Sequence, residues 1–201
     1  MSTDLWPAAV TLTGDHVRLE PLDPSHLDEL VANCAADPEV FRWVWPYDVP
    51  DAATMHRVTD LAFAERDAGT RIPFAQRRMS DGQVVGSTSY LDLSQRDRHV
   101  EIGWTFLSRG AWRTPINTEA KFLLLGHAFD DLGCERVSLK TDHLNLRSQR
   151  AIERLGATRE GVLRHRQLRA DGTWRDTVYY SILRDEWPDV RYNLQQRLAT
   201  P

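Results

Sequence analysis

Three strand-like segments follow one another between residues 72 and 107 with very little chain between them. They span residues 72–79, 83–91 and 98–107. The step Ser80-Asp81-Gly82 between the first two is typical of a hairpin turn. Strands joined by so little chain run antiparallel, because a parallel connection needs a crossover of a dozen residues or more. This part of the chain therefore predicts an antiparallel meander.

Segments with helical periodicity flank the meander on both sides. A strand over residues 16–22 precedes a helix capped by Asp23 and a second helix over 51–68. The later elements are a helix over 118–132 that Gly133 ends, a strand over 136–141, a helix over 145–155, paired strands over 162–169 and 174–183, and a short C-terminal helix. This order predicts the α+β class, with a mixed, mainly antiparallel central sheet flanked by helices. Because no internal repeat or linker divides the chain, we expect a single domain over residues 1–201.

Composition and charge exclude several classes of protein. A hydrophobic content of 41% with seven Trp is typical of a folded chain, and a net charge of −4 gives no general attraction to nucleic acid. Seven arginines between Arg147 and Arg169 leave a nucleic-acid binder open as a secondary reading, although such runs are usually solvated faces. Cys34 and Cys134 have no metal or redox spacing, and the chain contains no long apolar run and no secretory signal. We therefore expect a cytoplasmic protein with no membrane partner and no metal.

One strand–loop–helix sequence has the composition of an anion site. The strand over 100–107 runs through an irregular loop over 108–117 into the helix that Thr118 opens. The start of a helix presents unpaired N–H groups and the positive end of the helix dipole, which suits a pyrophosphate.

Four short motifs in this order resemble a known family. They are Glu-Ile-Gly-Trp at 101–104, Asn-Thr-Glu-Ala at 117–120, Asn-Leu-Arg-Ser at 145–148, and Leu-Gly-Ala at 155–157 followed by Glu-Gly-Val-Leu-Arg at 160–164. Over residues 16–187 the chain is similar to the GNAT superfamily of acyl-CoA N-acyltransferases, in the branch of ribosomal-protein N-terminal acetyltransferases. The resemblance implies the GNAT acyl-CoA N-acyltransferase fold and acetyl-CoA, or another acyl-CoA, as co-substrate. In that fold the sheet opens between the strands ending near Leu107 and starting near Arg136, and pantetheine lies there.

The resemblance also implies which residues bind the cofactor. We expect the thioester end on the backbone of Trp104 and Phe106, and the remainder on Arg109, Arg113, Ile116, Asn117, Thr118 and Asn145. The family's phosphate loop has the form Gln/Arg-x-x-Gly-x-Gly/Ala, and here Trp112, Pro115 and Asn117 occupy its three defining positions. Because proline has no N–H, one phosphate donor is absent from the family's usual set, and the two arginines compensate by charge.

The reaction needs a base for the amine and an acid for the leaving thiolate. Glu101 matches the strand position of the general base in several relatives, and its apolar neighbours favour a raised pKa. The alternative is a Glu held by a nearby Arg, with His99 on the same face as a reserve base. Ser148 matches the acid of the ribosomal-type branch, although Asn145 and Ser148 also fit a helix cap and first turn.

For the acceptor amine we expect contacts with Trp45, Tyr47, Asp176 and Tyr180. An ion pair of Asp176 with Arg164 or Arg166 is the alternative for that carboxylate. The function indicated is transfer of an acyl group, acetyl in the first place, from acyl-CoA to a primary amine by direct attack in a ternary complex. A succinyl-type acyltransferase and a non-catalytic acyl-CoA-binding or regulatory module stay open. So do the acceptor, which is a small molecule or a protein N-terminus, and a homodimer.

Overall fold

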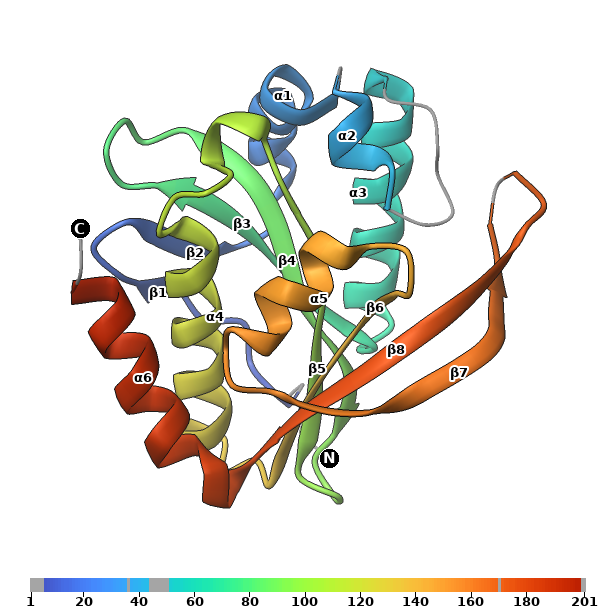
Figure 1. The fold of residues 1–201 in the computed structure, drawn as a ribbon. Helices are drawn as coiled ribbons and strands as arrows, with labels where there is room; N and C mark the ends of the chain where they lie inside the picture. Colours follow the sequence, from blue (N-terminus) through green and yellow to red (C-terminus); the bar gives the residue numbers. More distant parts are fainter. Residues whose placement is uncertain (1–5, 36, 44–50, 170, 200–201) are drawn as a thin grey trace.

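The computed structural model describes residues 6–35, 37–43, 51–169 and 171–199, which form one mixed sheet with helices on both faces (Figure 1). The strands are β1 (Leu12–Thr13), β2 (Val17–Pro21), β3 (Arg71–Arg78), β4 (Val84–Ser94), β5 (His99–Leu107), β6 (Arg136–Asp142), β7 (Thr158–Leu168) and β8 (Trp174–Leu183). The α-helices are α1 (Leu27–Leu30), α2 (Pro38–Phe41), α3 (Ala52–Asp67), α4 (Ile116–Gly126), α5 (Leu146–Glu153) and α6 (Trp187–Ala199). Short 3-10 or π-helical turns are η1 (Pro24–His26), η2 (Val31–Ala35), η3 (Arg109–Ala111), η4 (His127–Asp131) and η5 (Arg184–Glu186).

The strand order is β1-β2-β3-β4-β5-β6-β8-β7, and only β5 and β6 pair in parallel. The predicted meander is present as β3, β4 and β5, so the predicted α+β class with a mainly antiparallel sheet is confirmed. The two-residue strand β1 was not predicted from the sequence. Asp23 caps η1 as predicted, and Gly133 and Gly156 end their helical segments with φ angles of 66° and 97°.

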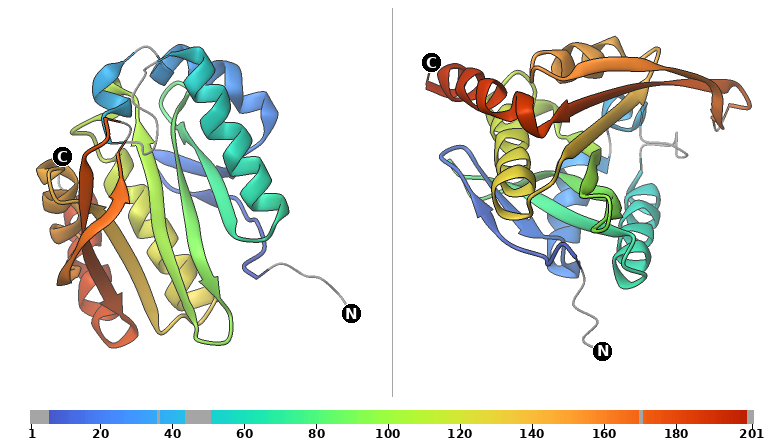
Figure 2. Two further views of the ribbon diagram at one scale, coloured as in Figure 1. Left: turned by 90° about the vertical axis from the view of Figure 1, so that its right-hand side faces the viewer. Right: turned by 90° about the horizontal axis from the view of Figure 1, so that it is seen from below.

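Helices cover both faces of the sheet (Figure 2). The larger hydrophobic core lies on the face covered by α4 and α6, and it contains Val100, Ile102, Val137 and Leu139. The smaller core, on the other face, packs α1, η2, α2 and α3 against the sheet through residues such as Ala75 and Phe106. Strand alternation places Glu101 and its neighbours of the same parity on the α3 face.

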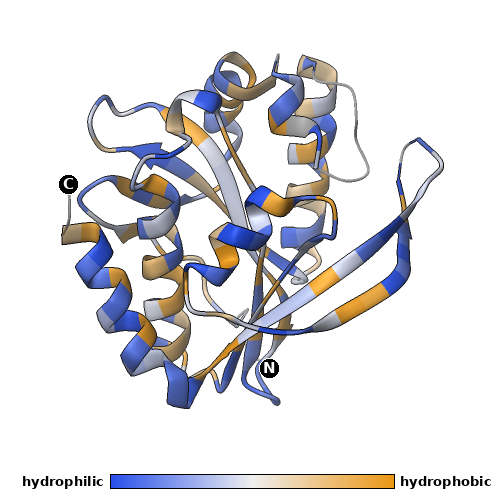
Figure 3. Cartoon of the chain, in the orientation of Figure 1, coloured by the Kyte–Doolittle hydropathy of each residue, from blue (hydrophilic) through white to orange (hydrophobic). Residues whose placement is uncertain are grey.

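The hairpin formed by β7 and β8 projects beyond the helical layers (Figure 1). Hydrophobic stretches lie along it (Figure 3), and Leu163 and Trp174 on the hairpin are 49% and 51% exposed. No helix in the described parts of the chain combines the length and the hydropathy needed to cross a membrane.

Candidate active site

The site is built where β5 and β6 part from each other. The two strands pair only from His99–Arg136 to Glu101–Ser138, although both continue further. Beyond Glu101 and Ser138 the two strands no longer pair with each other. We call these two segments, residues 102–107 of β5 and 139–142 of β6, the fork. Because the strands are parallel, their carboxyl ends lie at the same edge of the sheet, and the helices that follow both begin there. The contact of Arg147 at the start of α5 with Trp112 before α4, 3.7 Å from guanidinium carbon to ring centre, shows how close the two helix starts lie.

A β-bulge interrupts β5 within the fork. Gly103 lies opposite Ser89 and Phe106 opposite Ser87, so Trp104 and Thr105 have no ladder partner on β4. Trp104 takes a φ of 49°, an unusual conformation for a residue with a side chain. The buried Arg71 guanidinium lies 4.7 Å from the centre of its ring and also bonds Ser89 and Glu65. Of the two backbone positions expected at the thioester, only Trp104 lies in the bulge; Phe106 is in the ladder, and the second bulge residue is Thr105.

The predicted phosphate loop connects β5 to α4 through the turn η3. Arg113 takes a φ of 60°, which turns the chain immediately before the helix. Within the described residues, the main-chain N–H groups of Arg113, Thr114, Asn117 and Thr118 have no acceptor. Pro115 is the N-cap of α4, and Ile116 is the first residue of the helix. Free N–H groups at a helix start after a left-handed residue form a concave anion site.

The charges around this loop differ in part from the prediction. Arg109 donates to both carboxylate oxygens of Asp37, at 2.7 and 2.9 Å, and holds the pKa of that carboxyl down at about 2. The guanidinium of Arg109 is thus engaged with Asp37, and its predicted contact with phosphate stays a prediction. Arg113 is exposed and Arg147 stacks on Trp112, and neither forms an ion pair with a described residue. Arg147 was not predicted to lie beside this loop, although it belongs to the motif at 145–148.

Glu101 is 3% exposed and lies immediately before the fork. Its Oε2 atom is 2.8 Å from Lys140 Nζ, and its buried Oε1 atom has no hydrogen-bond partner in the part of the chain that the structure describes. Burial raises the pKa of the Glu101 carboxyl, and the Lys140 ammonium opposes that rise. A Cβ on Gly103 would lie 2.9 Å from Oε1, so glycine provides the space that this side chain occupies. The alternative expected for Glu101 was an ion pair with an Arg, and the observed partner is Lys140. His99 lies on the same face of the sheet as Glu101 and contacts Asp92.

A second buried charge, not found by sequence reasoning, lies on the α4 side of the bulge. Lys121 Nζ donates to Thr88 Oγ1 at 3.0 Å and to Thr105 Oγ1 at 2.6 Å, and no carboxylate of the described residues pairs with it. Burial lowers the pKa of Lys121 to about 7. Thr105 is itself exposed, so a buried amine stands directly behind an accessible hydroxyl of the fork.

Asn145 and Ser148 occupy the start of α5, where the helix-cap interpretation placed them. Asn145 Oδ1 accepts from the main-chain N–H of Ser148 at 3.0 Å, so the capping prediction is confirmed. The Ser148 hydroxyl forms no hydrogen bond to a described residue.

The acceptor residues expected from sequence are not brought together. Trp45 and Tyr47 lie outside the described residues. Tyr180 is fully buried in the larger core and donates to Glu153, and Asp176 accepts from the main-chain N–H of His165. Strand alternation turns these two side chains away from the Glu101 face, and their contact with the acceptor stays a prediction. Residues of β8 on the Glu101 face, which the sequence analysis missed, are Arg175, Thr177 and Tyr179.

Glu119 lies in the first turn of α4. Its buried carboxylate accepts three main-chain N–H groups, from Asp15, His16 and Val17 at 2.7–2.9 Å. It ties α4 to the turn between β1 and β2.

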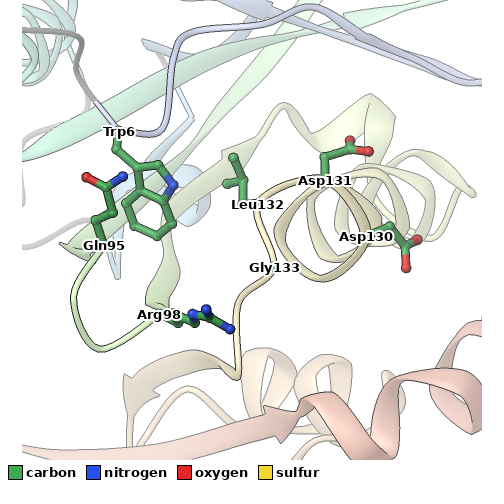
Figure 4. A pocket seen from close by; sticks show the side chains of 7 residues that line it. All are labelled: Trp6, Gln95, Arg98, Asp130, Asp131, Leu132 and Gly133. Carbon is green, nitrogen blue, oxygen red and sulfur yellow. The ribbon is translucent and has the colours of Figure 1, made fainter. Parts of the chain in front are cut away.

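A cavity of about 410 Å³ lies at the opposite end of the strands from the fork (Figure 4). Trp6, Gln95, Arg98, Asp130, Asp131, Leu132 and Gly133 line it. None of the candidate site residues named above lines it. The described residues also contain no cluster of three His, Cys, Asp or Glu side chains arranged to hold a metal ion.

The mixed sheet that opens between two parallel strands, a bulge in the opening and helix starts facing it together define an acyl-CoA N-acyltransferase. Residues 16–158 match the family model "Acetyltransferase (GNAT) domain". The chain is 30% identical over 169 residues to "Putative ribosomal N-acetyltransferase YdaF" of Bacillus subtilis (strain 168), covering 84% of this chain and 90% of that protein.

Solved structures agree. A GCN5-related N-acetyltransferase from Brucella melitensis has a TM-score of 0.87 at 31% identity, covering 96% of this chain and 87% of that one. A T. thermophilus protein described as a "putative acetyltransferase" has a TM-score of 0.85 at 39% identity, covering 96% of this chain and 99% of that one. The chain therefore belongs to the GNAT family, and it is an acetyl-CoA-dependent N-acetyltransferase.

Proposed function

We propose that the protein transfers the acetyl group of acetyl-CoA to a primary amine by direct attack in a ternary complex. The observation that supports this most strongly is the buried Glu101 carboxylate at the start of the fork, with one oxygen unpartnered. A carboxylate of raised pKa accepts a proton from an ammonium or amine more readily than an exposed one. Glu101 Oε1 takes the proton as the amine nitrogen attacks the thioester carbonyl carbon.

The fork holds the cofactor in this proposal. The backbone of the bulge at Trp104 and Thr105 lies along the thioester, where N–H donors stabilise the oxyanion that develops on the carbonyl. The diphosphate lies on the free N–H groups of Arg113, Asn117 and Thr118 at the start of α4, beside Ile116. Arg113 and Arg147 supply positive charge there, in place of the donor that Pro115 lacks.

The start of α5 supplies the proton for the leaving thiolate in this proposal. Asn145 fixes the first turn, and the unpartnered Ser148 hydroxyl donates a proton to the CoA sulfur as the carbon–sulfur bond breaks. The products are the N-acetyl amine and CoA thiol. The buried, unpaired Cys34 and Cys134 fit a reducing compartment, so we place the protein in the cytoplasm.

The name of YdaF supports a protein N-terminus as one acceptor class, and a small-molecule amine is the second. Initial rates with acetyl-CoA, succinyl-CoA and an amine panel test the function, together with calorimetric titration of acetyl-CoA. We expect acetyl transfer, with intersecting lines in double-reciprocal plots because both substrates bind before reaction. Binding of acetyl-CoA without transfer to any amine would instead identify a non-catalytic module, and preference for succinyl-CoA would correct the acyl group.

A further inference from the structure

Unpartnered polar atoms gather on the Glu101 face of the sheet. Among the described residues, five buried side-chain nitrogen or oxygen atoms lack a hydrogen-bond partner. Three of them, Glu101 Oε1, Arg175 Nε and Thr177 Oγ1, lie on this one face. Buried polar groups are nearly always paired, so a concentration of unpaired ones indicates a place that a polar ligand fills.

Arg175 is the least satisfied of the three. Its side chain is 12% exposed, and its guanidinium forms no hydrogen bond to a described residue. The carboxylate that comes nearest, Asp142 Oδ2, is 3.9 Å from Nε. That carboxylate is already occupied, because Arg169 donates to both its oxygens at 2.9 Å and the main-chain N–H of Leu144 donates to one of them.

The other basic side chains named on this face each have an acidic partner. Lys140 pairs with Glu101, Arg169 with Asp142, Arg71 with Glu65, and His99 contacts Asp92. Arg175 has no carboxylate of its own among the described residues, and its charge and that of Glu101 act on each other. A guanidinium stays charged when it is buried, and its planar donors match a carboxylate.

We propose that the acceptor is a primary amine that carries a carboxylate, with the amine at Glu101 and the carboxylate at Arg175. The proposal rests on the proposed function and names its substrate class. Thr177 supplies a hydroxyl donor beside the guanidinium. The pair Glu101 and Arg175 then recognises the two charged ends of one molecule, and Lys140 keeps the base in place. A free amino acid and a peptide with an acidic residue next to its N-terminus both carry this chemistry.

Matched acceptors test the proposal on the unmodified enzyme. Each free amino acid is compared with its carboxamide, and the C-terminally amidated peptide Ala-Asp-Ala is compared with amidated Ala-Asn-Ala, at saturating acetyl-CoA. Losing a hydrogen bond to a charged group weakens binding by about tenfold to a hundredfold, so we expect KM to rise by that factor when the carboxylate becomes a carboxamide. The arm that shows the difference identifies the source as free amino acid or peptide.

Variants separate recognition from chemistry. Arg175→Gln is expected to raise KM for the carboxylate acceptor about tenfold or more, and so to remove the preference for the carboxylate over the carboxamide. Arg175→Lys keeps the charge without the planar fork and is expected to be intermediate. The matched control is Arg166→Gln, an exposed arginine of the same hairpin that lies in the irregular stretch of β7 between Leu163 and Gln167.

The possible results distinguish a failure of this inference from a failure of the proposed function. Acetylation of both members of each pair with equal KM overturns the inference and leaves the acetyltransferase intact. Acetyl-CoA binding with transfer to no amine overturns the proposed function, and the inference with it. A carboxylate preference that survives unchanged in a folded Arg175→Gln variant also contradicts the assignment to Arg175.

Discussion

Glu101 keeps a raised pKa although an ammonium group touches it. Desolvation of the carboxylate is the largest influence, and it exceeds the attraction of Lys140 2.8 Å away. The unpartnered Oε1 atom explains the balance, since a fully hydrogen-bonded carboxylate would be stabilised in its charged form. Lys140 therefore limits how far the pKa of this base rises.

This balance between desolvation and the charge of Lys140 predicts how kcat/KM changes on the acid side of its pH profile. The base acts as the carboxylate, so kcat/KM rises with pH through the pKa of Glu101, above the ordinary range of a glutamate. Lys140→Met removes the favourable charge and moves this limb to higher pH. Glu101→Gln removes the limb and lowers kcat about a hundredfold or more. Initial-rate assays from acid to neutral pH measure the shift of the limb and its loss. A limb that persists in Glu101→Gln and disappears in His99→Gln would show that His99 is the general base.

Lys121 predicts a pH-dependent stability. Its pKa is about 7 in the folded protein and 10.5 when unperturbed, so between these values the unfolded chain binds a proton that the folded one does not. The free energy of unfolding therefore rises with pH in this window, by at most roughly 1.4 kcal/mol per pH unit from this group.

Lys121→Met removes that dependence. We expect the variant to be more stable than the parent at neutral pH and the difference to narrow as the pH rises toward the unperturbed pKa of lysine, as measured by urea unfolding. The matched control is Lys140→Met, which removes the same charge from an ion-paired side chain that is 32% exposed. A constant difference between Lys121→Met and the parent over the window would show that the buried amine does not titrate there.

At the scale of elements, the start of α5 combines a structural cap with a proposed acid, and the two can be separated. The cap uses the main-chain N–H of Ser148 and not its hydroxyl. Ser148→Ala is therefore expected to change the free energy of unfolding by less than about 0.5 kcal/mol and to lower kcat about a hundredfold. Asn145→Ala, the comparison for stability, is expected to cost about 1 kcal/mol. Unchanged turnover in Ser148→Ala would show that Ser148 is not the acid.

The loop before α4 contains Pro115, and the N–H group that this proline lacks leads to a prediction about the affinity for acetyl-CoA. Pro115 has a φ of −60°, which other residues adopt without strain, and it lacks the N–H that the family's glycine offers. Pro115→Gly, with Pro115→Ala as its control, is expected to keep or improve the affinity for acetyl-CoA in calorimetric titration. Severely weakened binding in both variants would show that the proline is required for the shape of the loop.

Local patterns predicted the elements well, because strand alternation, Asp23, Asn145 and the glycine stops act over a few residues. They also placed Glu101 and His99 on one face. The side-chain partners were not predictable in this way. Arg109 meets Asp37 across 72 positions, and Lys140 meets Glu101 only through the register of the parallel pair. Arg175 was missed for the same reason, because its face depends on β8 lying beside β6.

At the scale of the whole molecule, one sheet joins the two hydrophobic cores. Neighbouring residues of β5 enter different cores, Phe106 the smaller and Leu107 the larger, and Trp112 packs against both. Opening either core therefore disturbs the strand that supports the other, and it also separates the helix starts at the fork.

This arrangement predicts that the chain unfolds as one unit and that the cofactor stabilises all of it. We expect tryptophan fluorescence and far-UV circular dichroism to give coincident urea transitions, because no core survives alone. Acetyl-CoA at about a hundred times its Kd is expected to raise the free energy of unfolding by about 2.7 kcal/mol without splitting the transition. Two separated transitions, of which only one responds to acetyl-CoA, would divide the chain into independent units and confine the fork to one of them.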